Sequence, residues 1–121
     1  MFTMAIPVLH VSSAVAAEEF YRRLGFRKEF GHRADERTPD PCYMGFSRDH
    51  AWLHVSSFSG DGVSGSVAMV LVGDVDRLYE KLLRQHVPIA LEPTDQTWGN
   101  REMYVRDPDG NSIRFVQPAG G

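Results

Sequence analysis

Residues 98–115 read WGNREMYVRDPDGNSIRF, which is two runs of alternating character separated by Asp107, Pro108, Asp109 and Gly110. Pro108 fixes φ for a turn, Gly110 tolerates positive φ, and aspartate side chains accept hydrogen bonds from nearby amides. The stretch therefore predicts a β-hairpin. This hairpin closes a chain of 121 residues whose second half repeats the pattern of its first half.

The repeat becomes visible when residues 6–26 are aligned with residues 67–87. Val11 then stands opposite Val72 and Arg23 opposite Arg84, an offset of 61 residues in both cases, which is half the chain. Each copy begins with an apolar run (IPVLHV and VAMVLV) and continues into a segment with helical spacing of its apolar residues. Each copy therefore predicts a strand followed by a helix.

Both helical segments follow a residue that favours a helix N-terminus, Ser13 in the first copy and Asp74 in the second. Such side chains accept hydrogen bonds from amides of the first turn that have no partner within the helix. Gly25 predicts the end of the first helix. Helical spacing indicates one buried apolar face on each helix, formed by Ala17, Phe20 and Leu24 in the first and by Val75, Leu78 and Leu82 in the second.

Six further runs of strand character complete the pattern, at residues 26–30, 42–47, 51–58, 87–91, 101–106 and 111–116. They predict a single α+β domain, 1–121, made of two βαβββ modules at about 1–60 and 65–121. Each module exposes an apolar sheet face that it cannot bury alone, so we expect the modules to pair around a shared concavity. Free sheet edges and an open apolar lining also predict a homodimer.

Composition excludes several classes of protein. The apolar content of 42% suffices for a core without disulfides or metal. A net charge of −3 and a pI near 5.9 argue against a nucleic-acid partner, because phosphate binding requires a clustered basic face on the protein. No apolar run approaches the length of a membrane span, no signal peptide is recognised, and the lone Cys42 fits a reducing compartment, so a cytoplasmic location is expected.

The segments FYRRLGF (20–26) and DPDGNSIRF (107–115), together with the repeat at half length, resemble the vicinal oxygen chelate superfamily. This superfamily contains glyoxalase I, extradiol dioxygenases, fosfomycin resistance enzymes and bleomycin resistance proteins. The resemblance covers nearly the whole chain and implies the glyoxalase/bleomycin resistance fold, in which two modules form a cupped mixed sheet and two copies commonly form a dimer.

The metal enzymes of that superfamily hold their ion with side chains that project into the cup from four strands. The resemblance places those positions on Ile6, His54, Gly65 and Arg114 of this chain. Ile6 and Gly65 have no donor side chain, and Arg114 is a permanent cation that repels a divalent ion. A shift of one strand would add His10 beside His54, still without a carboxylate. We therefore expect no metal, no cofactor and no catalytic residue, and we expect His32, His50 and His86 to lie in loops or at a helix end.

Without a metal, the resemblance is closest to the bleomycin resistance branch, whose members sequester a bulky drug in grooves at a dimer interface. Trp98 matches the position of the drug-stacking tryptophan of that branch. Strand alternation places Leu9, Val11, Leu53, Val55, Met103, Val105, Ile113 and Phe115 on the helix side. The expected ligand-binding residues are Trp98, Trp52, His54, Met69, Glu102, Tyr104 and Arg114.

Structural alternatives stand beside these assignments. Trp98 can simply cover the end of the sheet, Trp52 and Tyr104 can be packing residues, and His54 can be a hydrogen-bonded histidine rather than a base. Glu102 and Arg114 on neighbouring strands can pair with each other, because a buried charge must find a partner.

The sequence thus favours a metal-free binding protein of the bleomycin resistance type, which sequesters a bulky planar or cationic small molecule in a dimer groove without chemical change. The alternative is a metal-dependent glyoxalase-like lyase or isomerase, a dioxygenase or a thiol transferase. A small-molecule sensor or partner-binding module with no role in resistance is the third hypothesis. No membrane partner is expected. The ligand, any turnover and any exchange of strands between copies are left open.

Overall fold

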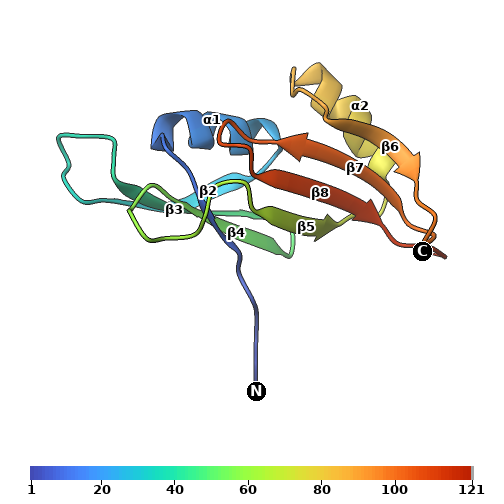
Figure 1. Ribbon diagram of the computed structural model, residues 1–121, viewed down its shortest axis with the longest axis horizontal. Coiled ribbons are helices and arrows are strands. Elements are labelled where there is room, and N and C mark those ends of the chain that lie inside the picture. The colour runs from blue at the N-terminus through green and yellow to red at the C-terminus, as the bar shows by residue number, and fades with distance from the viewer. Residues whose placement is uncertain (121) are drawn as a thin grey trace.

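The computed structural model of the chain describes residues 1–120 and contains two copies of a βαβββ unit (Figure 1). The first module consists of β1 (Val8–His10), α1 (Ala14–Arg23), β2 (Arg27–Arg33), β3 (Cys42–Arg48) and β4 (Ala51–Ser56). The second consists of β5 (Val67–Leu71), α2 (Val75–Arg84), β6 (Leu91–Asp95), β7 (Arg101–Arg106) and β8 (Ser112–Gln117).

Each module forms a four-stranded mixed sheet, with strand order β1-β4-β3-β2 in the first and β5-β8-β7-β6 in the second. The opening strand of each module pairs in parallel with its last strand, and the remaining pairs are antiparallel. The predicted fold class is confirmed. Neither helix of residues 1–120 is long and apolar enough to cross a membrane.

The helices begin and end where local chemistry predicts. The Ser13 hydroxyl accepts a hydrogen bond from the Ala16 amide at 3.2 Å, and the Asp74 carboxylate accepts one from the Arg77 amide at 3.1 Å. Gly25 follows α1 with a φ of 98°, a conformation that a side chain would oppose. Both N-terminal caps and the glycine stop are thus confirmed.

Alternation along the strands places one face of each sheet against its helix. The residues predicted on the helix side are all buried, with at most 3% of their surface exposed: Leu9, Val11, Leu53, Val55, Met103, Val105, Ile113 and Phe115. They pack with Ala17, Phe20 and Leu24 of the first module and with Val75 and Leu82 of the second. The opposite faces are free of helices, and their side chains form the candidate site.

Two details of the prediction are wrong. The strand expected at 87–91 begins only at Leu91, because Val87 is buried and its amide donates to the Leu82 carbonyl at 3.1 Å, and Pro88 has no amide to join a ladder. His32 lies on β2 rather than in a loop, since that strand extends to Arg33, although its side chain is exposed. His50 and His86 lie in a turn and at a helix end, as predicted.

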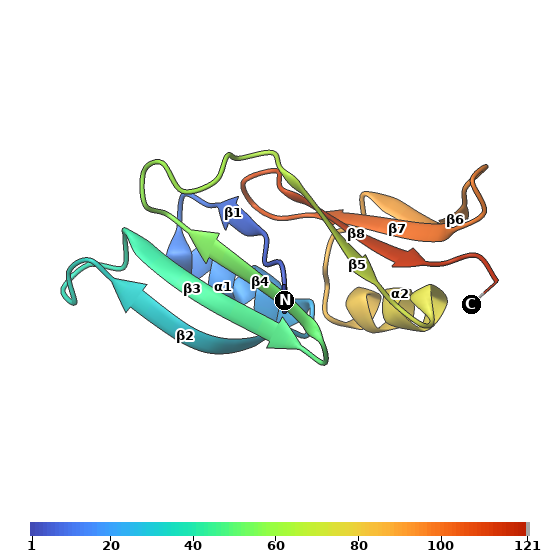
Figure 2. The same ribbon diagram turned by 90° about the horizontal axis from the view of Figure 1, so that it is seen from below.

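The β7–β8 turn of the second module lies beside β1 of the first module (Figure 2). The Tyr21 hydroxyl donates to the Asp107 carboxylate at 2.8 Å, and the Asn111 side-chain amide donates to the His10 carbonyl at 2.8 Å. The Ser12 amide also donates to the Asp109 carboxylate at 3.1 Å. The turn found in the sequence therefore joins the two modules.

Residues 1–7 form an extended arm that leaves the body of the molecule (Figure 1). Met1 and Phe2 are fully exposed, and Met4 is 57% exposed. Among residues 1–120, strand β5 pairs with β8 alone, so its other edge has no strand partner there. Its side chains Val67, Met69 and Leu71 are exposed on the same face. The arm and the free edge of β5 therefore expose a large amount of apolar surface.

Candidate ligand-binding site

The free face of the first sheet carries a cluster of aromatic rings. Phe30 of β2 lies parallel to Tyr43 of β3, with ring centroids 6.2 Å apart. His54 of β4 meets the Phe30 ring edge-on at 5.3 Å and the Trp52 ring edge-on at 6.4 Å. These arrangements are the ones that aromatic quadrupoles favour, so the cluster forms a rigid aromatic surface.

Gly45 makes this cluster possible. It lies between Phe30 and His54 in the strand register, and a Cβ at position 45 would overlap the Phe30 ring. The Phe30 ring therefore lies across the sheet and reaches the His54 ring. His54 Nδ1 is 2.7 Å from the Tyr43 hydroxyl, and partial burial lowers the pKa of His54, which favours a neutral imidazole near pH 7.

The free face of the second sheet is built around a buried carboxylate. Glu102 of β7 is 2% exposed and accepts a hydrogen bond from the Tyr104 hydroxyl at 2.6 Å and one from the Trp98 indole at 2.8 Å. These donors, the Tyr104 hydroxyl above all, hold the pKa of Glu102 below its usual value despite burial. The hydrogen bond to Glu102 fixes the orientation of the Trp98 indole, and 62% of the Trp98 surface remains exposed to solvent.

Arg114 of β8 lies next to this group. Its guanidinium carbon is 4.7 Å from the centre of the Tyr104 ring, which is a cation–π arrangement. Its Nε is buried and has no hydrogen-bond partner within residues 1–120. The structural alternative in which Glu102 pairs with Arg114 is wrong for the described part of the chain, because the two side chains form no ion pair there. The charge of Arg114 still helps to lower the pKa of Glu102 through space.

The seven predicted residues fall on two separate faces. Trp52 and His54 belong to the first sheet, whereas Met69, Glu102, Tyr104, Arg114 and the preceding Trp98 belong to the second. Within residues 1–120, no strand of one sheet pairs with a strand of the other. Figure 2 shows the first sheet face-on with α1 behind it, whereas α2 lies to one side of the second sheet. The two faces of one chain therefore point in different directions.

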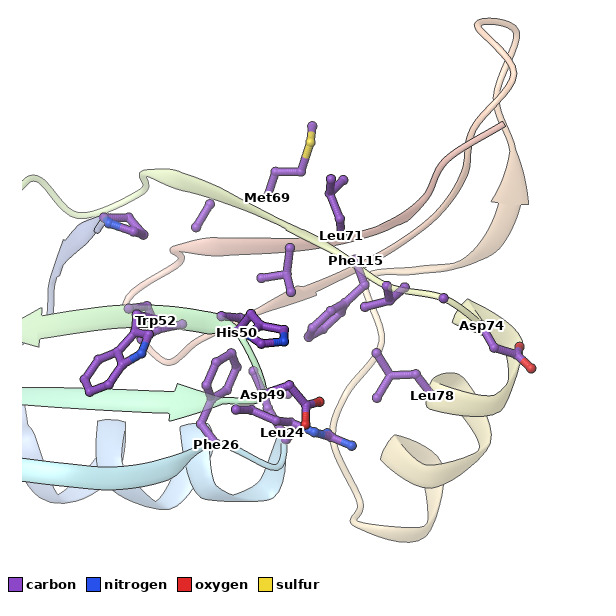
Figure 3. A pocket seen from close by; sticks show the side chains of 18 of the residues that line it. Leu24, Phe26, Asp49, His50, Trp52, Met69, Leu71, Asp74, Leu78 and Phe115 are labelled. Atoms are coloured by element: carbon purple, nitrogen blue, oxygen red, sulfur yellow. The ribbon is translucent and has the colours of Figure 1, made fainter. Parts of the chain in front are cut away.

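A crevice of about 620 Å³ lies between the modules (Figure 3). Phe26 and Trp52 line it from the first module, and Phe115 and Leu78 line it from the second. Only Trp52 and Met69 of the seven predicted residues reach it. The sequence predicts a concavity shared by the modules but does not predict which residues line this crevice, because the lining comes from several elements that are far apart along the chain.

The residues present do not fit the metal centre of the superfamily enzymes. Ile6 belongs to the arm, and Gly65 lies in the turn before β5, so neither position offers a donor atom. His10 Nδ1 is 3.0 Å from the Asp61 carbonyl. In the described residues, no group of three or more His, Cys, Asp or Glu side chains is placed to hold an ion.

Comparison with known proteins gives the family. A family model described as "Glyoxalase superfamily protein" matches residues 1–121. The chain belongs to the glyoxalase superfamily. No curated protein matches the chain in sequence.

Solved structures of this superfamily share the fold over nearly the full chain. A bleomycin-binding protein from Streptomyces verticillus, complexed with copper(II)-bleomycin, is 28% identical with a TM-score of 0.71, covering 100% of this chain and 98% of that chain. A superfamily member from Sphaerobacter thermophilus is 26% identical with a TM-score of 0.73, covering 96% and 98%. A bleomycin resistance determinant encoded on transposon Tn5 is 23% identical with a TM-score of 0.78, covering 97% and 98%.

Sequence reasoning missed Phe30 and Tyr43. Alternation along β3 indicates that Tyr43 shares a face with Gly45, so this signal was available. Phe30 follows an irregularity in the register between Lys28 and Phe30, which strict alternation cannot foresee.

Proposed function

We propose that this protein is a metal-free binding protein of the bleomycin resistance type, which sequesters a bulky planar or cationic small molecule without chemical change. The ligand lies in a groove between the two copies of a homodimer. The proposal includes a cytoplasmic location and no nucleic-acid or membrane partner. The ligand-binding residues are Trp52, His54, Met69, Trp98, Glu102, Tyr104 and Arg114.

The observation that carries the proposal is that Trp98 is exposed and is held in one orientation by a hydrogen bond to Glu102. An indole ring that is 62% exposed is costly unless something covers it, and here a buried carboxylate fixes its orientation. A ring fixed in this way loses little conformational entropy when a planar ligand stacks on it. The 28%-identical bleomycin-binding protein, which was crystallised with copper(II)-bleomycin, supports a ligand of this kind.

The directions in which the free faces of the two sheets point support the proposed dimer. The aromatic face around His54 and the face around Glu102 do not oppose each other within one chain, so a groove lined by both requires two copies. The exposed β5 residues and the apolar arm supply surface for such an interface, because water contact with Phe2 and Leu71 is unfavourable. An isologous pair then contains two equivalent grooves.

The side-chain chemistry of the candidate site supports the absence of a metal. Arg114 stands at a position where the metal enzymes have a ligand, and its positive charge opposes a divalent cation. His54 Nδ1 already interacts with Tyr43, and no carboxylate of this face completes a ligand set with it.

The test is calorimetric titration of the full chain with metal-free bleomycin, together with metal analysis after dialysis. We expect saturable heat with one drug per chain. Trp98→Ala should weaken binding about tenfold or more, since a stacked aromatic pair contributes roughly 0.5–1.5 kcal/mol in addition to the free energy of burying the ring surface. Phe58→Ala, in the loop after β4, is the control for an aromatic residue outside both faces. No heat on drug addition, combined with stoichiometric divalent metal, would overturn the proposal in favour of the enzyme alternative.

A further inference from the structure

The Arg114 guanidinium is the one feature of the candidate site that the protein itself leaves unsatisfied. An arginine carries five N–H donors, yet Arg114 forms no hydrogen bond or ion pair with any other residue of 1–120. Arg114 is half-buried, its buried Nε–H has no partner, which is unfavourable, and no residue of 1–120 accepts from its terminal N–H groups, so the position is best explained if a partner arrives from outside the chain. The Tyr104 ring holds the flat guanidinium in place but accepts none of its hydrogen bonds.

Glu102 is not that partner and is not open to a cationic ligand either. One of its carboxylate oxygens accepts from Tyr104 and the other accepts from Trp98. With 2% of its surface exposed, Glu102 cannot contact a bulky ammonium group unless these bonds break. Glu102 therefore contributes to the proposed binding site by positioning the Trp98 and Tyr104 side chains, and the charge available to a ligand belongs to Arg114.

The rings of the aromatic face of the first sheet carry no negative charge, and the Asp61 carboxylate near Tyr43 already accepts a hydrogen bond from the Ser56 hydroxyl at 2.9 Å. Its rings come from Phe30, Tyr43, Trp52 and His54, and burial lowers the pKa of His54 so that the ring is neutral near pH 7. A ligand that enters the proposed groove therefore meets flat apolar rings on one side and an indole with a free guanidinium on the other.

We propose that the ligand is a planar aromatic acid: its ring system stacks on Trp98, and its carboxylate accepts hydrogen bonds from Arg114. Guanidinium and carboxylate match in a planar, two-bond geometry, which makes arginine suited to this group. The contacts Trp98–Glu102–Tyr104–Arg114 are continuous, so stacking surface and anion donor lie within reach of one small molecule. This inference rests on the proposed function and narrows its ligand class from planar or cationic to planar and anionic.

Three naphthalene probes of equal size test the inference by calorimetry on the full chain: 2-naphthoate, 2-naphthamide and 2-naphthylmethylammonium. We expect naphthoate to bind about ten to a hundred times more tightly than naphthamide, which is the usual range for a hydrogen-bonded charge. The ammonium probe should bind most weakly. This comparison uses the unmodified protein and does not depend on how any variant folds.

Arg114→Gln keeps a planar polar side chain and removes the charge. It should lower naphthoate affinity to that of naphthamide while naphthamide affinity changes less than about threefold, a pattern that a merely structural role would not give. Arg37→Gln, in the exposed loop before β3, is the matched control and should leave all three affinities unchanged.

Two outcomes separate the inference from the proposed function. If metal-free bleomycin binds, but naphthoate binds no better than naphthamide or the ammonium probe, the inference fails and the proposed function stands. If neither bleomycin nor any naphthalene probe binds, both fail. The inference would also be overturned if the unmodified protein bound the ammonium probe most tightly and Arg114→Gln reduced the affinity for all three probes equally.

Discussion

The hydrogen bond between Tyr21 and Asp107 joins the two modules, and Tyr21→Phe removes it without changing the shape of the core. The Tyr21 side chain is fully buried against Phe20, Phe26 and Phe46, so the phenyl ring of the variant keeps its packing. Only the hydroxyl, 2.8 Å from the Asp107 carboxylate, is lost. The variant therefore isolates one polar contact between the modules.

The structure allows the size of the effect to be worked out. The Asp107 carboxylate keeps three other hydrogen bonds, from the Asp109 amide, the Asn111 amide and the Asn111 side chain. A buried hydrogen bond to a charged group contributes roughly 1.5–3 kcal/mol, and the remaining donors place the loss near the middle, at about 2 kcal/mol. With an unfolding entropy of about 2.1 cal/mol/K per residue, a chain of 121 residues should lose about 8 °C in Tm.

Urea unfolding followed by tryptophan fluorescence measures this loss module by module. The chain has two tryptophans, with Trp52 in the first module and Trp98 beside the second sheet. Trp98→Phe leaves only the first reporter, and Trp52→Phe leaves only the second. We propose that the chain unfolds as a single domain, so both reporters should give the same midpoint, and Tyr21→Phe should lower both midpoints together.

Tyr79→Phe on α2 is the control, because this tyrosine is half-buried and its neighbour Glu92 is exposed, so its hydroxyl should contribute under about 0.5 kcal/mol. A Tyr21→Phe variant as stable as Tyr79→Phe would refute the reasoning about the joint. Two separated transitions in the unmodified chain would refute the single-domain proposal.

Three further changes test other parts of the structure. Gly45→Ala should cost about 1–3 kcal/mol in urea unfolding, because the new Cβ must displace the Phe30 ring; an unchanged midpoint contradicts this packing. Burial raises the pKa of Tyr21 above the usual tyrosine value of about 10, so its stabilising effect is complete below about pH 10 and is lost at higher pH. Tyrosinate absorbance at 295 nm should therefore rise later in the folded chain than in urea. Deletion of residues 1–6 should weaken self-association in sedimentation, and undiminished dimer would exclude the arm from the interface.

The fold could be predicted from sequence because its signals are local. Alternation, the caps Ser13 and Asp74, and the Asp107-Pro108-Asp109-Gly110 turn each act within a few residues, and the repeat doubled the evidence for every element. The late start of β6 escaped prediction for a tertiary reason. Val87 has the apolar character of a strand residue, but it is buried just after α2, where its amide donates a hydrogen bond to the Leu82 carbonyl.

The candidate site could be predicted only in part. Register placed Glu102, Tyr104 and Arg114 on one face, and this is how the strands pair. The bonding among them depends on distances that a pattern does not contain. Charge alone favoured a Glu102–Arg114 pair, whereas the Tyr104 hydroxyl and the Trp98 indole are the groups that reach the carboxylate.

The two residues that join the modules lie in the segments that best reveal the family, and neither of them is among the residues proposed to contact a ligand. Tyr21 belongs to FYRRLGF and Asp107 to DPDGNSIRF, and these two residues hold the modules together. A match to these segments fixes how the sheets are arranged, which many ligands can share. In the proposed site, the choice of ligand depends on side chains that this joint does not constrain, above all Trp98 and Arg114. Relatives with the same joint but another residue in place of Arg114 should thus share this fold and bind different molecules.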